Sequence, residues 1–398
     1  MSATKINKQT GSVSLFVVIF AALLILLVAT AFIRIMLQDQ RQATANDLSR
    51  SALDSAYAGV EDTKRAIVEY YSKQCQLATT SSSDCDALKI ALGTGDWTTD
   101  CTAVPKLLNI TNEPNMGFLL KEGTNNALDQ AYTCIKVQMS PYDYLGSLTP
   151  NTSRIIKLQA TDANDPKKVK IEWYAMTDGQ SMSADSGTNP VYQLPRDWPQ
   201  DRPPIVKAQL LQFRNDLDLD SFDQDMAHNT TLFLLPSDLG VSTTFFTSAD
   251  HPRAGSQLGF ALPVTCKKPT PGTTRYACSI TINLPEVDGG TGDRTAYLKL
   301  SQFYNSTNTD FRVTMLDDAA PNGNPLRFKD VQPVVDSTGR ANDLFRRIRS
   351  RIDVGVSSVP NPESAVDVSK SLCKIFAVTD STVEATKYML DGTCPNIP

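Results

Sequence analysis

The sequence predicts an α+β protein in which a long N-terminal transmembrane and amphipathic α-helix precedes a β-rich globular head with an antiparallel sheet. Three observations support this fold class. A long apolar run lies near the N-terminus, an amphipathic pattern continues it, and short alternating runs fill the second half of the 398-residue chain. The residues after the helix suffice for one large or two ordinary domains.

The apolar run of 19 residues extends from Leu15 to Ile33 and contains no charge, Pro or Gly. At 1.5 Å per residue it measures about 28 Å, close to the hydrocarbon thickness of a bilayer. A buried core helix is the alternative, but such helices are seldom apolar on every face. We therefore expect this segment to span a membrane.

The pattern turns amphipathic after Arg34 and contains no Pro or Gly before Gly59. Charged residues occupy the other faces of this continuation. We therefore expect one helix over residues 12–72, ending near Tyr71 to Gln74. Its apolar side chains recur at three- and four-residue steps, at Leu37, Ala45, Leu48, Ala52, Ala56, Val60, Ile67 and Tyr71.

Composition divides the rest of the chain into four parts. Residues 73–180 are expected to form the first part of the head. Residues 181–204, rich in Ser, Asp, Pro and Gly, indicate a linker or loop. Residues 205–355 indicate a β-rich head or a domain inserted into the sheet, and 356–398 form a C-terminal tail.

Strand signals are sharpest after residue 152. The runs 153–160 and 168–176 flank a turn cluster at 162–166 and predict an antiparallel hairpin. Near the C-terminus, 336–340 predicts a turn and 344–354 a final strand. Other expected elements are a short helix at 87–92 and strands at 117–120, 131–139, 205–213, 230–235, 257–265, 276–284, 295–303, 310–316 and 326–335.

The eight cysteines form an even set with no C-x-x-C spacing, and only His228 and His251 are available to help ligate a metal. We interpret the set as four disulfides in an oxidising compartment, with free buried thiols as the alternative. Local spacing favours a pair across a predicted hairpin at 266 and 278, and a pair that encloses a polar loop at 75 and 85. The cysteines are Cys75, Cys85, Cys101, Cys134, Cys266, Cys278, Cys373 and Cys394.

The sequence predicts neither an enzyme nor a cofactor. It lacks G-x-S-x-G, Walker-type and H-E-x-x-H motifs, which removes the common hydrolase and nucleotide signatures. The formal charge of −5 is mildly acidic, so it gives no general attraction to nucleic acid or anionic lipid.

The most tempting metal site consists of Asp216, Asp218 and Asp220, because closely spaced carboxylates supply the oxygen ligands that calcium prefers. This run lacks the Gly and the terminal Glu of an EF-hand. Its strict alternation is also that of a strand edge whose aspartates face water, and we favour this interpretation.

A second candidate surface consists of Arg347, Arg349 and Arg351, which alternate along the final predicted strand and therefore share a face. They could bind phosphates or an acidic neighbouring subunit, although such a row is more often a solvated face. Four N-glycosylation sequons are typical of exposed loops, at Asn109, Asn151, Asn229 and Asn305.

The N-terminal region resembles the type IV pilins, and more closely their minor, PilX-type members. The matching residues are Lys8-Gln9-Thr10-Gly11, the apolar helix, and the Ala-rich stretch from Ser51 to Glu61. The resemblance covers roughly the first 70 residues. It implies a pilin-like fold and a prepilin leader over 1–11, which prepilin peptidase removes by cutting between Gly11 and Ser12. In this family the uncut helix stays in the membrane, and the cut form packs against other pilin subunits in an extracellular filament.

Three departures from the family pattern favour a minor over a bulk subunit. Phe16 stands where most major pilins carry Glu, Ser12 replaces the usual Phe, and no Pro interrupts the apolar helix. The predicted closing hairpin again resembles PilX-type pilins. Cys373 and Cys394 bracket a tail that looks like the disulfide-bounded C-terminal loop of many pilins.

Three functions remain open at this point. The first is a minor pilin of a type IV pilus whose head serves pilus assembly or adhesion. The second is a signal-anchored surface binding protein with no filament role, and the third is a secreted protein cut after Ala29-Thr30-Ala31. The sequence leaves open the bound partner and whether the output is motility, adhesion or DNA uptake.

Overall fold

The computed structural model describes residues 11–77, 82–93, 95–110, 112–113, 117–119, 130–150, 152–161, 165–177, 179–183, 197–213, 228–245, 261–270, 272, 274–286, 295–304, 307–319 and 323–353. The chain forms two compact units. Unit 1 contains Met1–Thr63, Asp100–Ile135 and Asp336–Arg349, and unit 2 contains Lys64–Thr99, Lys136–Val335 and Ser350–Pro398.

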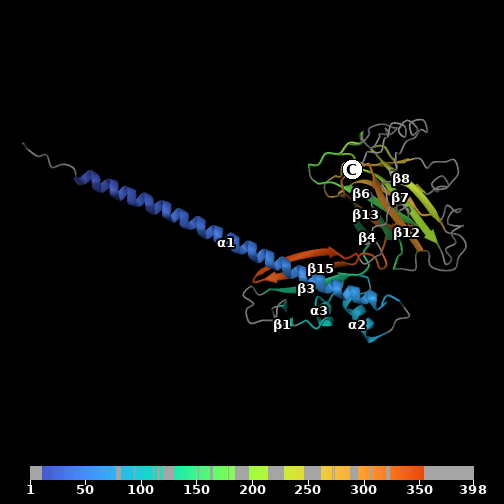
Figure 1. Cartoon of the computed structure of the whole chain (residues 1–398), viewed down its shortest axis with the longest axis horizontal. Coiled ribbons are helices and arrows are strands. Elements are labelled where there is room, and N and C mark those ends of the chain that lie inside the picture. The colour runs from blue at the N-terminus through green and yellow to red at the C-terminus, as the bar shows by residue number, and fades with distance from the viewer. Residues whose placement is uncertain are drawn as a thin grey trace, which may run out of the picture. The chain divides into compact units, whose positions relative to one another are not determined.

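The expected N-terminal helix is confirmed. Helix α1 spans Gly11–Ser72, a single element of 62 residues (Figure 1). It ends where the sequence predicts, because Gln74 adopts a left-handed conformation with φ of 55°. The amide of Cys75 then donates to the carbonyl of Tyr70, which satisfies one of the last free carbonyls of the helix.

The first sheet has the strand order β1-β2-β3-β15-β16. Strand β3 therefore neighbours β15, although all of β4 to β14 lies between them in the chain. The first sheet is thus completed by residues from two distant parts of the sequence. Its strands are β1 Asn112–Glu113, β2 Gly117–Leu119, β3 Ala131–Gln138, β15 Val334–Ala341 and β16 Leu344–Arg351, with the short helix α3 Ala103–Leu107 before β1.

Unit 2 contains two further sheets, with orders β10-β8-β7-β12-β5 and β14-β13-β6-β11-β9, and β4 also pairs with β13. Most neighbours are antiparallel, but β8 with β10 and β9 with β11 are parallel, so the sheets are mixed. The strands are β4 Asp143–Leu148, β5 Ser153–Lys157, β6 Lys168–Ala175, β7 Ile205–Phe213, β8 Asn229–Ser237, β9 Thr243–Phe245, β10 Ala261–Thr265, β11 Tyr276–Asn283, β12 Thr295–Phe303, β13 Thr309–Leu316 and β14 Pro325–Leu326. Helix α2, Ser83–Leu92, completes the unit.

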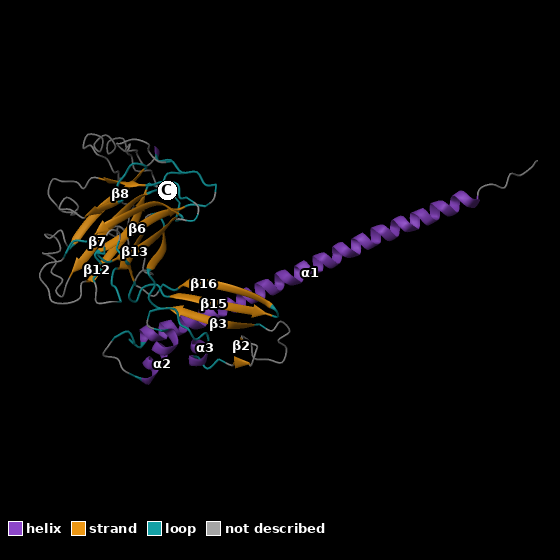
Figure 2. Ribbon diagram, turned by 180° about the vertical axis from the view of Figure 1, so that it is seen from behind, coloured by secondary structure: helices purple, strands orange, loops and turns teal. Residues whose placement is uncertain are grey.

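Both sheets of unit 2 contribute to one hydrophobic core, which makes them a β-sandwich (Figure 2). Alternate residues of each strand point inward, as in β12, where Ala296, Leu298 and Leu300 are fully buried. Trp173 of β6 and Phe311 of β13 lie at the same register position of the facing sheet and are also fully buried. The alternation that predicted the strands therefore corresponds to the inner faces of the sandwich.

Three disulfides occur among the described residues. Cys101 pairs with Cys134 in unit 1. Cys75 pairs with Cys85 and Cys266 with Cys278 in unit 2, which are the two pairs that local spacing favours. Cys373 and Cys394 lie outside the described residues.

Two predicted hairpins are wrong. Strands β5 and β6 are consecutive in the chain, but β5 pairs with β12 and β6 pairs with β11 and β13 in the other sheet. Likewise, β10 pairs with β8 and β11 with β6, so only Cys266 and Cys278 themselves form an antiparallel bridge. In both cases the chain crosses from one sheet to the other, and the inner face of each strand joins the shared core.

The predicted turn at 336–340 is also wrong, since these residues lie inside β15. The turn between β15 and β16 consists of Asn342 and Asp343, with φ of 50° at Asn342. Asn adopts a positive φ more readily than most residues, so it suits this position. The expected strand at 326–335 is reduced to β14 and the start of β15, whereas β4, β9 and α3 were not predicted.

Candidate functional site

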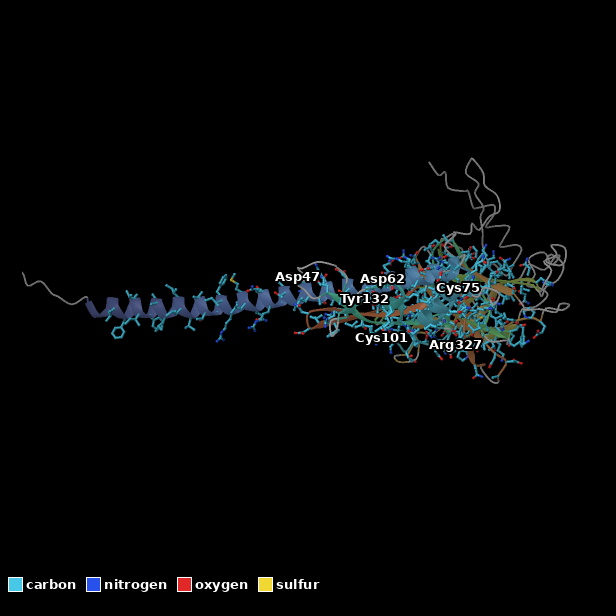
Figure 3. All side chains as sticks on the ribbon, turned by 90° about the horizontal axis from the view of Figure 1, so that it is seen from below. Asp47, Asp62, Cys75, Cys101, Tyr132 and Arg327 are labelled. Carbon is cyan, nitrogen blue, oxygen red and sulfur yellow. A yellow bond between two sulfur atoms is a disulfide. The ribbon has the colours of Figure 1, made fainter. Side chains whose placement is uncertain are left out.

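The first half of α1 lies outside any packed core in unit 1. Every residue from Leu15 to Asp47 is exposed, and in Figure 3 the side chains of the N-terminal part of the helix project away from its axis. Its apolar part, Leu15 to Ile33, is called here the exposed apolar segment. Phe16 and Phe20 are each 73% exposed, and Leu27 is 71% exposed.

Contact of these apolar side chains with water is unfavourable, so lipid or other protein must shield them. The described residues contain one helix that is long and apolar enough to cross a membrane, with a mean hydropathy of 3.1 over its most apolar window. Isolated apolar patches on soluble proteins rarely exceed a few hundred Å². A helix that is apolar on all faces is stable only in lipid or against other protein.

The side chains of the exposed apolar segment form two shallow grooves on one side of the helix. Phe16, Phe20 and Leu24 border the first groove, and Leu24, Val28 and Phe32 border the second. These residues follow four-residue steps, which are the ridges that interdigitate when two helices pack. The surface can therefore contact either lipid chains or the ridges of another helix.

Gly11 and Ser12 are the first two residues of α1, and residues 1–10 lie outside the described residues. Arg34 follows the apolar run directly, and Asp39 and Arg41 follow within two further turns. A membrane interface can therefore lie near Arg34 without burying a charge.

The second half of α1 is fixed to the first sheet in unit 1 through small residues. Gly339 of β15 lies against the α1 backbone at Ala52, Ser55 and Ala56. Ala52 and Ala56 are fully buried, as is the Ser55 hydroxyl group, which donates to the Ser51 carbonyl 2.8 Å away. The small side chains of the Ala-rich stretch thus allow the strand to approach the helix closely.

A second close approach occurs one turn later. Gly59 leaves room for the side chains of Tyr132 and Ser337, and the Tyr132 hydroxyl donates to the Asp62 carboxylate at 2.9 Å. Figure 3 shows Asp62 and Tyr132 next to each other. Arg346 of β16 also donates to the Ser49 hydroxyl at 2.7 Å. The helix from Ser49 to Asp62 is therefore held by both β3 and the closing hairpin.

The calcium candidates Asp216, Asp218 and Asp220 lie outside the described residues. Within the part of the chain that the structure describes, no group of three His, Cys, Asp or Glu residues could hold a metal ion. His228 contacts the carbonyl of Gln212 at 2.8 Å, and His251 is outside the described residues.

The three arginines do not form one free surface. Both carboxylate oxygens of Asp336 accept from Arg347, with a distance of 2.6 Å to its Nε. Arg351 donates to the Asp143 carboxylate at 2.6 Å, while Arg349 is exposed. Two of the three arginines are therefore already paired with carboxylates of the same chain.

Two of the four sequon asparagines lie among the described residues. Asn109 is exposed with φ of 54°, as expected of a loop. Asn229, however, begins strand β8, is buried, and accepts from Gln209 at 3.0 Å. Asn229 is therefore not an exposed-loop site.

Sequence reasoning missed a pocket in unit 2 that contains Tyr71, Lys157 and Asp330. These residues belong to α1, β5 and the segment before β15, and no local pattern connects such distant positions. The positive φ of 57° at Asp330 has no sequence signal either.

Comparison of the chain with protein-family models, curated proteins and solved structures yields no significant match. The assignment of function therefore depends on the residues and on their arrangement.

Proposed function

We propose that this chain is a minor, PilX-type pilin of a type IV pilus. The precursor is anchored in the membrane by the exposed apolar segment, and prepilin peptidase cuts it between Gly11 and Ser12. The mature helix then packs against the helices of other pilin subunits. The remainder of the chain faces outward, where it serves pilus assembly or adhesion, and it has no enzymatic role.

The observation that carries this proposal is the contrast between the two halves of α1. In unit 1 the apolar half is exposed throughout, whereas the half from Ser49 onward is fixed to a sheet. A subunit that assembles through its helix needs a free apolar half and a rigid attachment for the other half. The resemblance of Lys8 to Gly11 and of the Ala-rich stretch to pilins supports the same conclusion.

The disulfides support placement of the head outside the cytoplasm. Three pairs occur among the described residues, and all six of these cysteines are oxidised. Structural disulfides persist in the periplasm and outside the cell, and they are rare in the cytosol.

A surface anchor without a filament role is the competing function, because lipid alone can also cover the exposed apolar segment. N-terminal sequencing of the protein from a type IV piliated host tests the proposal. The expected first residue is Ser12, in protein recovered with sheared filaments. An intact Met1 in the membrane fraction would identify a signal anchor, and a start at Phe32 in the medium would identify a secreted protein. Either result would contradict the pilin proposal.

A further inference from the structure

Unit 2 contains a pocket of about 520 Å³, and all residues that line it belong to this unit. This volume lies in the range of about 300–1,000 Å³ that is typical of small-molecule sites. The end of α1, the segment after it, strands β5 and β12, and the segment between β14 and β15 all contribute to its walls. The pocket is therefore formed by several elements of unit 2 and not by a single loop.

The charged groups of the pocket are balanced in sign. Lys157 and Lys329 oppose Asp330 and Asp353. Lys157 and Asp330 are both about half-buried, so burial lowers the pKa of the Lys157 ammonium and raises the pKa of the Asp330 carboxyl. Lys157 and Asp330 thus place one positive and one negative charge beside the pocket, and the two charges cancel.

The protein leaves several of these polar groups incompletely bonded. The Tyr71 hydroxyl donates to Asp330 over a long 3.4 Å, and among the described residues no carboxylate forms an ion pair with Lys157. The side-chain oxygen of Gln76, which also lines the pocket, is buried without a hydrogen-bond partner. Buried polar groups nearly always form hydrogen bonds. These polar groups of the pocket are therefore suited to bind a polar ligand.

The remaining walls are aromatic and aliphatic. Tyr71, Tyr144 and Tyr297 line the pocket together with Ile156 and Val331. Tyrosine offers an apolar ring face and a polar hydroxyl at its edge. The site therefore combines tyrosine side chains with an ammonium, carboxylates and amides.

We propose that this pocket binds a saccharide without net charge, one or two rings in size. The C–H faces of a sugar ring pack on tyrosine rings, and its hydroxyl groups both donate and accept. They can thus satisfy Lys157, Asp330 and Gln76 at once, whereas an inorganic anion satisfies only the lysine. Because binding is a property of unit 2, this inference goes beyond the proposed function and does not depend on filament assembly.

The test uses the full chain, purified in a polyoxyethylene detergent that carries no sugar head group. The probes are glucose, galactose, N-acetylglucosamine and lactose, with glycine and inorganic phosphate as comparison ligands. Binding is measured by saturation-transfer NMR and by calorimetry. We expect at least one saccharide to bind, with weaker or no binding of glycine and phosphate.

Two variants place the binding in the pocket. Lys157→Met keeps the aliphatic stem and removes the ammonium, and Asp330→Asn keeps the side-chain shape and removes the charge. Each is expected to weaken binding about tenfold or more, because hydrogen bonds to charged groups are the stronger ones. The matched control is Lys267→Met, at an exposed lysine outside the pocket, which should leave binding unchanged.

A readout on the unmodified chain keeps the proposal testable if a variant fails to fold. Bound saccharide should slow the reductive methylation of Lys157 and leave that of Lys267 unchanged, as mapped by mass spectrometry. The proposal is overturned if no saccharide binds, if glycine or phosphate binds more tightly, or if binding occurs without protecting Lys157.

Discussion

Gly339 of β15 packs so closely on α1 at Ala56 that a Cβ atom at position 339 would overlap the helix backbone. The atoms in the way are the Ala52 oxygen and the Ala56 nitrogen, which belong to the helix backbone and cannot rotate aside. This contact joins the Ala-rich stretch near the N-terminus to a strand near the C-terminus. It fixes the helix that presents the exposed apolar segment.

We therefore expect Gly339→Ala to destabilise unit 1 by about 3 kcal/mol, the upper end of the range for overpacking. Hydrogen exchange followed by mass spectrometry should report faster exchange in α1 from Ser49 to Asp62 and in β15. The matched control is Gly95→Ala, because nothing lies within 4 Å of a Cβ at Gly95. Equal protection in the two variants would show that the close approach does not support the helix.

Leu24→Lys tests the exposed apolar segment at its centre. A charge there costs about 3 kcal/mol on membrane-insertion scales, and more in a dry helix bundle without a partner. We expect the variant to remain partly in the membrane but to disappear from sheared filaments. The control is Leu24→Ile, which keeps volume and polarity. Normal amounts of the Lys variant in filaments would indicate that the segment does not pack against other helices.

Substitution of Gly11 tests the processing site. A peptidase that cuts after Gly11 accepts a small residue at this position and rejects a large charged one. Gly11→Ala should therefore mature normally, and Gly11→Glu should stay uncut. The measurement is the mass of the N-terminal peptide in each variant. Unchanged maturation of the Glu variant would count against the pilin proposal.

The bridge between Cys266 and Cys278 joins strand ends that belong to different sheets of unit 2. It closes a loop with a sequence separation of 12, for which the chain-entropy model gives about 3 kcal/mol of stabilisation. The double substitution of both cysteines by Ser should therefore lower the midpoint of thermal unfolding.

Thiol labelling of the denatured wild type without reductant should find essentially no free Cys266, Cys278, Cys373 or Cys394. Substantial labelling of these cysteines would contradict an exported, disulfide-bonded protein.

Asp330→Asn tests the electrostatics of the pocket. Burial raises the pKa of the Asp330 carboxyl above its usual value of 3.8, so the folded state holds this proton more tightly than the unfolded state does. The stability contributed by the proton is fully present below pH 3.8 and is lost as pH rises through the folded pKa. The variant should therefore be more stable than the wild type at pH 7, and this difference should vanish near pH 3. Thermal unfolding of both proteins across this range checks the prediction, and a difference independent of pH would contradict it.

The sequence by itself determined the features that depend on local pattern. Residues 15–33 are apolar on every face, so helix α1 and its membrane-spanning length follow from composition and from 1.5 Å per residue. Alternation likewise placed β7, β11 and β12 nearly to the residue, because each has one face in a core. The proximity of Cys75 to Cys85, and of Cys266 to Cys278, was enough to favour those pairs.

Only the tertiary structure decided which strands are neighbours. A strand's alternation shows that one face is buried but does not say against what, so β5 and β6 look like a hairpin and yet belong to different sheets. The pairing of β3 with β15 across the whole inserted sandwich has no local signal. The same holds for the pocket around Lys157 and Asp330, because its lining residues come from positions that are far apart in the chain.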